Sequence, residues 1–156
     1  MSKRIKLLAL GAGAALAVIG AAGAQTSAGG PIHVPSKDVE AMVAKPVKGL
    51  ASAQIPAGPG VVVMIARRDG DGEVEVHKAL ADEMMVREGH ARIRVGGAVT
   101  GQRQSAPGEF RGGTLAGGAV YDMSAGDVLF IPVGAPHQML VKAGEHIVYL
   151  TAKFPG

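Results

Sequence analysis

Short runs of apolar and β-branched residues alternate with turn residues along most of the chain. Eight runs have the length and composition of strands, at 61–67, 73–77, 84–87, 91–95, 119–123, 128–132, 138–141 and 146–153. Glycine, aspartate and proline punctuate these runs, and no segment between them has the apolar spacing of a helix. Regularly spaced short strands of this kind predict an antiparallel sandwich or barrel.

A short amphipathic helix is predicted ahead of the strands. Within residues 37–45, three apolar side chains recur at helical spacing and would lie on one face. Ser36 stands at the N-cap position, where its hydroxyl oxygen would accept a bond from a free backbone N–H, and Pro46 would end the helix. We expect this helix to cover an apolar surface.

The first 24 residues have the pattern of a secretory signal. Three basic residues precede an apolar run of about 13 residues, and small residues ending at Ala24 fit a cleavage site. The run is shorter than the roughly 20 residues that a bilayer core requires, so no membrane anchor is expected after cleavage. We therefore expect a periplasmic or secreted protein with an N-terminal arm at 25–54 and one β-barrel domain at 55–156.

Composition narrows the range of partners and chemistry. Lys and Arg total 16 against 13 Asp and Glu, and the three basic residues of the leader account for the whole excess. Two Tyr and three Phe are too few for base-stacking platforms, so nucleic acid is not expected as a partner. The absence of cysteine excludes disulfides, zinc–thiolate sites and a cysteine nucleophile, which leaves histidines and carboxylates for any chemistry.

The segment from Gly126 to His137, with the sequence GDVLFIPVGAPH, predicts a turn, a strand and a bend in succession. Gly-Asp turns the chain and four apolar residues form a buried strand. Pro132 and Gly134 then bend the chain and direct His137 toward a fixed point. This segment resembles the second motif of the cupins, G-x5-P-x-G-x2-H-x3-N, at every position up to the histidine, and Val141 replaces the final Asn.

The first cupin motif, G-x5-H-x-H-x3-4-E-x6-G, is matched in part. His77 takes the place of its second histidine, Glu75 of its first histidine, Asp82 of its glutamate and Gly89 of its last glycine. The resemblance covers residues 61–154. It implies an all-β, cupin-type jelly-roll barrel with a short N-terminal helical arm.

The resemblance also implies a divalent metal site. His77, Asp82 and His137 would supply two imidazoles and a carboxylate, with Glu75 as a fourth ligand. Nitrogen and oxygen donors leave iron, manganese, zinc and nickel open. Glu83 is the alternative to Asp82 if the turn after the first histidine is one residue longer.

Three kinds of function remain open from the sequence. In the first, the protein is a metal-dependent enzyme in which the ion acts as a Lewis acid or oxygen carrier toward a small organic acid, phenol or sugar derivative. In the second alternative, His77 and Asp82 are a hydrogen-bonded pair in a metal-free cavity that binds a small molecule without catalysis. The third is a structural dimer whose barrel is packed shut.

Two further expectations concern ligand and partner. Residues 97–118 are rich in glycine and longer than a hairpin needs, so we expect a loop at one mouth of the barrel. Arg103 and Arg111 in it would bind a substrate carboxylate, unless the loop is simply solvated. If His77 faces the interior, the valines that alternate with it face outward and need cover, from residues 36–45 or from a second subunit. A homodimer is therefore expected.

Overall fold

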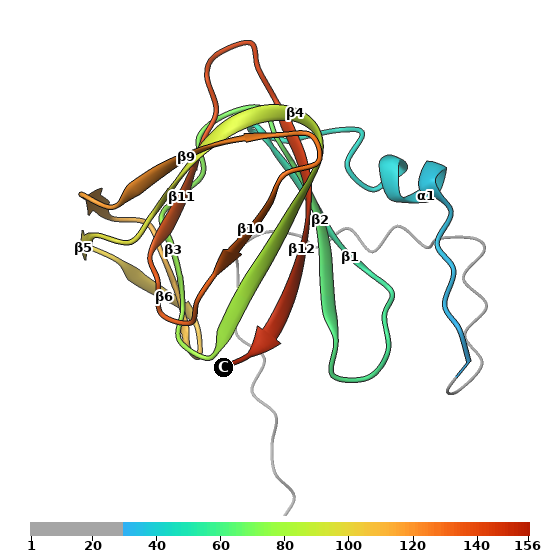
Figure 1. The fold of residues 1–156 in the computed structure, drawn as a ribbon, viewed down its shortest axis with the longest axis horizontal. Helices are drawn as coiled ribbons and strands as arrows, with labels where there is room; N and C mark the ends of the chain where they lie inside the picture. Colours follow the sequence, from blue (N-terminus) through green and yellow to red (C-terminus); the bar gives the residue numbers. More distant parts are fainter. Residues whose placement is uncertain (1–29) are drawn as a thin grey trace, which may run out of the picture.

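The structure is a computed structural model that describes residues 30–156 (Figure 1). The predicted secretory signal lies outside these residues. Within them the chain forms a curled antiparallel barrel preceded by a short helix. No helix of the described part is long and apolar enough to cross a membrane.

The barrel is built mainly from one sheet that curls around the core. The elements are α1 (Ser36–Ala41), β1 (Leu50–Ile55), β2 (Val62–Arg68), β3 (Glu75–His77), β4 (Leu80–Val95), β5 (Ala98–Thr100), β6 (Arg103–Ala106), β7 (Glu109–Arg111), β8 (Thr114–Ala116), β9 (Ala119–Ser124), β10 (Val128–Ile131), β11 (His137–Leu140) and β12 (Ile147–Pro155). The strand order is β1-β2-β12-β4-β11-β3-β7-β6, β9 and β10 also pair with β4, and β5 pairs with β8 in a small separate sheet. The predicted all-β barrel is confirmed.

Strand β4 connects the two halves of the barrel. Its first half pairs with β10 and β12, and its second half pairs with β9 and β11. The predicted strands at 84–87 and 91–95 are thus parts of one strand. Gly89 lies where β4 changes partners, with a φ of 73°. A Cβ at this position would collide with the carbonyl oxygen of His146, so the strand needs glycine here.

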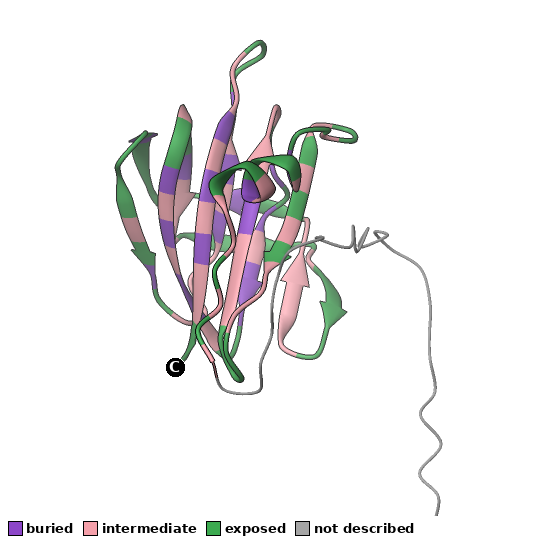
Figure 2. Cartoon of the chain, turned by 90° about the vertical axis from the view of Figure 1, so that its right-hand side faces the viewer, coloured by how far each residue is buried: buried purple, intermediate pink, exposed green. Residues whose placement is uncertain are grey.

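Buried residues alternate with more exposed ones along several strands (Figure 2), because successive side chains point to opposite sides of a sheet. The apolar interior is centred on three isoleucines, Ile93, Ile131 and Ile147, which are 1% exposed or less. Met84 and Met139 pack with them. Burial of each side chain of this size contributes about 1.5–3 kcal/mol, which holds the strands in register.

Helix α1 covers part of the outer sheet surface, where Val39 and Val43 pack against Ile65 of β2. The helix differs from the prediction at both ends. Pro35 is the N-cap, and Ser36 is the first helical residue, with its hydroxyl 2.8 Å from the carboxylate of Glu40. The backbone tightens to i→i−3 hydrogen bonds after Met42, at Val43 and Ala44. The helix therefore ends earlier than predicted.

Two other segments differ from the sequence prediction. β1 lies in the predicted arm, yet it pairs with β2 over its whole length, so the sheet begins at Leu50. Residues 97–118, predicted to be a loop, instead contain four short strands, β5 to β8. The frequent glycines of this segment fit this result because the turns between the strands require positive φ.

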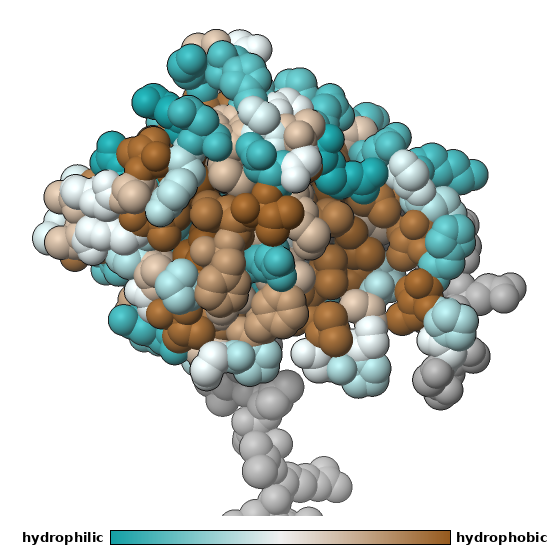
Figure 3. Space-filling model, viewed as in Figure 1, coloured by the Kyte–Doolittle hydropathy of each residue, from teal (hydrophilic) through white to brown (hydrophobic). Residues whose placement is uncertain are grey.

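The valines that alternate with the candidate ligands of β3 are already covered. Val74 and Val76 are only 1% and 3% exposed within the single chain. Helix α1 belongs to a different cluster, so it does not supply this cover, contrary to expectation. The exposed large apolar side chains include Val128 and Phe130 of β10. Apolar surface extends across the face of the barrel that carries this strand (Figure 3).

Candidate metal centre

Three predicted ligands are brought together by β3 and β11. Glu75 and His77 lie two residues apart on β3 and project to the same side. His137 begins β11 and pairs with Glu75 across the two strands. The bend before it is fixed by a hydrogen bond from the Gly134 N–H to the carbonyl oxygen of His77, 2.8 Å long. The motif thus aims His137 at its partners, as its sequence suggests.

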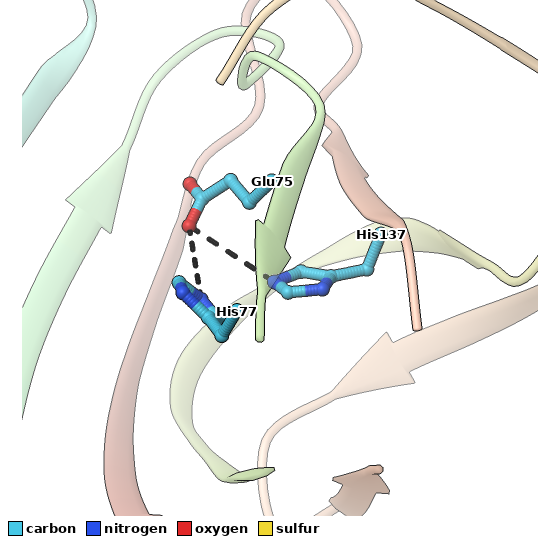
Figure 4. Close-up of side chains that lie close together, drawn as sticks. All are labelled: Glu75, His77 and His137. Atoms are coloured by element: carbon cyan, nitrogen blue, oxygen red, sulfur yellow. Dashed lines mark ion pairs between the residues drawn. The ribbon is translucent and has the colours of Figure 1, made fainter. Parts of the chain in front are cut away.

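The three side chains converge in the interior (Figure 4). Glu75 Oε2 lies 3.7 Å from His77 Nε2 and 4.0 Å from His137 Nε2. One ligand atom from each of the three lies within 4.8 Å of the other two. Both imidazoles are buried, with ring centroids 5.3 Å apart.

Asp82 approaches the same two imidazoles from β4. Its Oδ2 lies 3.3 Å from His77 Nε2 and 3.8 Å from His137 Nε2. Asp82 is buried, whereas Glu83 follows it on the opposite side of the strand. The structure therefore places Asp82, and not Glu83, at the cluster.

These separations suit a single ion. Donor atoms bound at about 2.0–2.2 Å to a common tetrahedral or octahedral ion lie roughly 3.0–4.2 Å apart. The distances between the imidazole nitrogens and the two carboxylates, 3.3 to 4.0 Å, fall in this range. The donor set thus fits a divalent first-row metal, and the group that could hold it contains Glu75, His77 and His137.

The second nitrogen of His77 has a partner that the sequence did not assign. Glu109 of β7 lies directly opposite His77 of β3, and its Oε2 is 2.5 Å from Nδ1. An ionised carboxylate accepts a hydrogen bond from the Nδ1–H group, which leaves Nε2 as the lone-pair nitrogen of a neutral ring. Carboxylates that orient ligating histidines in this way are typical of metal sites.

Cations from the chain also reach the cluster. Lys153 Nζ lies 2.6 Å from Asp82 Oδ1 and 3.1 Å from His77 Nε2. Arg111 forms an ion pair with Glu75 Oε2, and Arg68 Nη2 lies 2.9 Å from Glu75 Oε1. Each carboxylate of the cluster therefore faces at least one positive group of the chain.

These contacts shift the acid–base properties of the two imidazoles in opposite directions. Burial lowers the pKa of His137, and the nearby carboxylates only partly offset it. For His77 burial and the charge of Lys153 act in the same direction, but the hydrogen bond that the protonated ring gives to Asp82 and the charges of Asp82 and Glu109 outweigh them and raise its pKa above the ordinary value. His77 is therefore protonated more readily than His137, so protons compete with a metal ion mainly at His77.

The carboxylates stay ionised. Burial by itself would raise the pKa of Asp82, but the interaction with His77 when that ring is protonated and the hydrogen bond from Lys153 hold it below its usual value. Burial likewise opposes ionisation of Glu75, and Arg111, His137 and the other cations lower its pKa. Ionised carboxylates are the form that a metal ion requires.

The two predicted substrate-binding arginines have different positions. Arg111 lies at the cluster through its ion pair with Glu75 and is about 29% exposed. Arg103 forms a bidentate pair with Glu73 on the surface, at 2.8 and 2.9 Å. The structure therefore brings Arg111, and not Arg103, to the candidate site.

Sequence reasoning missed Lys153 and Arg68. Lys153 lies on the same face of β12 as Tyr149 and Thr151, so alternation along that strand was the available signal. Arg68 is held between Glu75 and the Tyr149 hydroxyl, which accepts from its Nε at 3.0 Å. Gly72 leaves space for its guanidinium, since a Cβ there would lie 3.0 Å from it.

Comparisons with known proteins identify the fold. No protein-family model matches the chain, and no curated protein matches it. An uncharacterized conserved protein with a double-stranded β-helix domain from Klebsiella pneumoniae is 20% identical, with a TM-score of 0.55 over 76% of this chain and 87% of that one. A cupin-2 domain protein from Rhodospirillum rubrum is 18% identical, with a TM-score of 0.51 over 72% and 68%.

A polyketide cyclase from Streptomyces resistomycificus is also similar, at 18% identity and a TM-score of 0.49. The match covers 69% of this chain and 66% of the cyclase, so the chain spans slightly less than two thirds of its length. The chain has the double-stranded β-helix fold of the cupins, as the resemblance in its sequence implied. Its interior holds a group of histidines and a glutamate able to hold a metal ion.

Proposed function

We propose that this protein is an exported cupin that holds one divalent metal ion through His77, Asp82 and His137, with Glu75 as a fourth ligand, and uses it on a small organic molecule. The observation that carries the proposal is the convergence of two buried imidazole nitrogens and two carboxylates at separations of 3.3 to 4.0 Å. Iron, manganese, zinc and nickel all suit this donor set.

The chain's own residues define what the site would do. When bound, the ion would supply Lewis acidity toward an oxygen atom of the substrate. Glu109 holds the His77 ring in one orientation. Arg111 would bind an anionic group of the substrate, since its guanidinium is partly exposed beside Glu75.

The experiment that tests this function is elemental analysis of protein carrying no affinity tag. Apo protein would be reconstituted with iron(II), manganese, zinc or nickel under reducing conditions and freed of loose ions. We expect about one ion per chain in the wild type for at least one metal, and loss of that ion in His137→Ala. His90→Ala is the matched control because this histidine is 58% exposed and lies outside the cluster.

Retention of the ion by His137→Ala, or its loss from His90→Ala alone, would contradict the proposed ligands. Failure of the wild type to retain any of the four metals would favour the second function, a metal-free cavity that binds a small molecule without catalysis. One observation supports this alternative. Lys153 already bridges Asp82 and His77, so the cluster is paired without an ion.

The proposed homodimer involves a different surface from the one first expected. The side chains of Val128 and Phe130 on β10 are 58% and 60% exposed, and the surface around them is apolar (Figure 3). A second copy of the chain would cover this surface. Light scattering should give the dimer mass for the wild type and the monomer mass for Phe130→Asp. Val120→Asp, on β9, is the control and should remain dimeric.

A further inference from the structure

One cation of the chain occupies the space that a metal ligated by His77 and Asp82 would need. Lys153 lies on β12 directly opposite Asp82 of β4, and both side chains face the interior. The Lys153 side chain is 13% exposed, so its ammonium is held inside the barrel yet keeps some contact with solvent. Its two partners, at 2.6 and 3.1 Å, are both candidate metal ligands.

The hydrogen-bond pattern around His77 makes the competition direct. Because Nδ1 donates to Glu109, the neutral ring offers a single lone pair, on Nε2. That lone pair accepts from the Lys153 ammonium. A metal ion bound to His77 would use the same lone pair, so the ion and the ammonium exclude one another.

Electrostatic repulsion also prevents the ion and the Lys153 ammonium from occupying the site together. The ammonium forms the shorter of its two contacts with Asp82, which is 5% exposed at its side chain. A divalent ion at Asp82 would bring two positive groups within a few ångströms in a poorly solvated interior, where repulsion between them is strong. Binding of the ion therefore requires the lysine side chain to leave.

We propose that Lys153 is a built-in competitor for the metal position: its ammonium keeps His77 and Asp82 paired in the metal-free protein, and a divalent ion displaces it. This inference rests on the proposed metal-binding function. The displaced Lys153 would also have a role in substrate binding, because a free ammonium next to the ion would favour substrates that carry a negative charge. The metal-free protein stays folded and electrically balanced, and the metal-loaded protein gains a positive group beside its ion.

The first test is titration of zinc(II) into apo protein by calorimetry at one fixed pH. Lys153→Met keeps the length of the side chain and removes its charge. We expect it to bind zinc roughly tenfold more tightly than the wild type, or better. Lys142→Met is the matched control, since this lysine is 70% exposed and lies outside the cluster, and its affinity should equal that of the wild type.

The outcomes separate this inference from the proposed function. Equal zinc affinity in the wild type and Lys153→Met overturns the competitor role and leaves the metal site intact. Zinc binding only in Lys153→Met supports the competitor role and overturns metal binding by the natural protein. Absence of zinc binding in both variants overturns both proposals.

A second measurement uses the wild type alone and so does not depend on the folding of a variant. Acetic anhydride would be applied with and without zinc, and acetylation of each lysine would be read by peptide mass spectrometry. We expect Lys153 to react more slowly than Lys142 in the apo protein and several times faster after zinc is added. Unchanged reactivity of Lys153 in zinc-saturated protein would overturn the displacement.

Discussion

Glu109 and His77 face each other across the pair β3–β7, with Oε2 of the glutamate 2.5 Å from Nδ1 of the imidazole. The segment that carries Glu109 lies between Gly97 and Gly118, which the sequence alone suggested to be a loop. Its strands instead return to β3 and place a carboxylate behind a candidate metal ligand. The segment is therefore part of the site, because it fixes the ring that must present Nε2 to an ion.

Replacement of this carboxylate should weaken metal binding without removing a ligand. Glu109→Gln keeps the size of the side chain but removes the charge that orients and polarises His77. We expect zinc affinity to fall by about 10- to 100-fold. Titration calorimetry measures the change. Glu88→Gln is the matched control, since Glu88 is 67% exposed and pairs with His146, outside the cluster, so the zinc affinity of this variant should be unchanged.

Metal affinity should depend on pH in a direction set by His77. Only the neutral imidazole binds an ion, and the carboxylates around His77 raise its pKa despite the opposing effect of burial. Affinity should therefore begin to fall while the pH is still above 6.5, the ordinary pKa of histidine, and continue to fall in more acidic solution. Calorimetry across a pH series measures this. An affinity that stays constant from pH 8 to about pH 5 would show that histidine does not hold the ion.

Asp82 and Lys153 should be coupled in the stability of the metal-free protein. Asp82→Asn leaves the buried ammonium without its charged partner, and the free energy of unfolding should fall by about 3 kcal/mol. Adding Lys153→Met to that variant removes the unpaired charge and should recover part of the loss. Urea unfolding of the wild type, both single variants and the double variant gives the coupling. Additive losses would show that the two residues act independently.

The segment 97–118, which carries Glu109, depends on a close backbone contact at Gly113. This residue has a φ of 81°, and a Cβ on it would collide with the carbonyl oxygen of Thr100. Gly113→Ala should therefore loosen the segment and weaken zinc binding several-fold. Gly144→Ala is the control, because its φ is 83° and nothing lies within 4 Å of the added Cβ. Both variants carry backbone strain, so a loss of zinc affinity in Gly113→Ala alone isolates the contact.

Much of the fold and part of the site follow from local sequence pattern. The segment that ends at His137 has its turn, strand and bend encoded in neighbouring residues, and the structure contains each of them. The strand is not buried throughout, as the sequence predicted, because its side chains alternate between the two sides of the sheet: Val128 and Phe130 are exposed, and Ile131 is buried. Glu75 and His77 share a face because strand alternation is local. Asp82 could be placed by its spacing from His77, although only the structure separates it from Glu83 at the cluster.

The other residues of the site depend on pairings between distant strands. Lys153 meets Asp82 only because β12 pairs with β4 in one register, and Glu109 meets His77 only because β7 returns to β3. No local pattern fixes either register. The same reason explains the missed strand β1, whose alternation is weak and whose partner is β2.

The central claim is that His77, Asp82 and His137 share one ion. The most direct measurement is anomalous X-ray scattering from crystals of zinc-loaded protein, recorded on both sides of the zinc absorption edge. The account predicts one peak about 2.0–2.1 Å from Nε2 of both imidazoles, with the Lys153 ammonium moved away from His77. A structure without that peak, in which Lys153 still bridges Asp82 and His77, would contradict it.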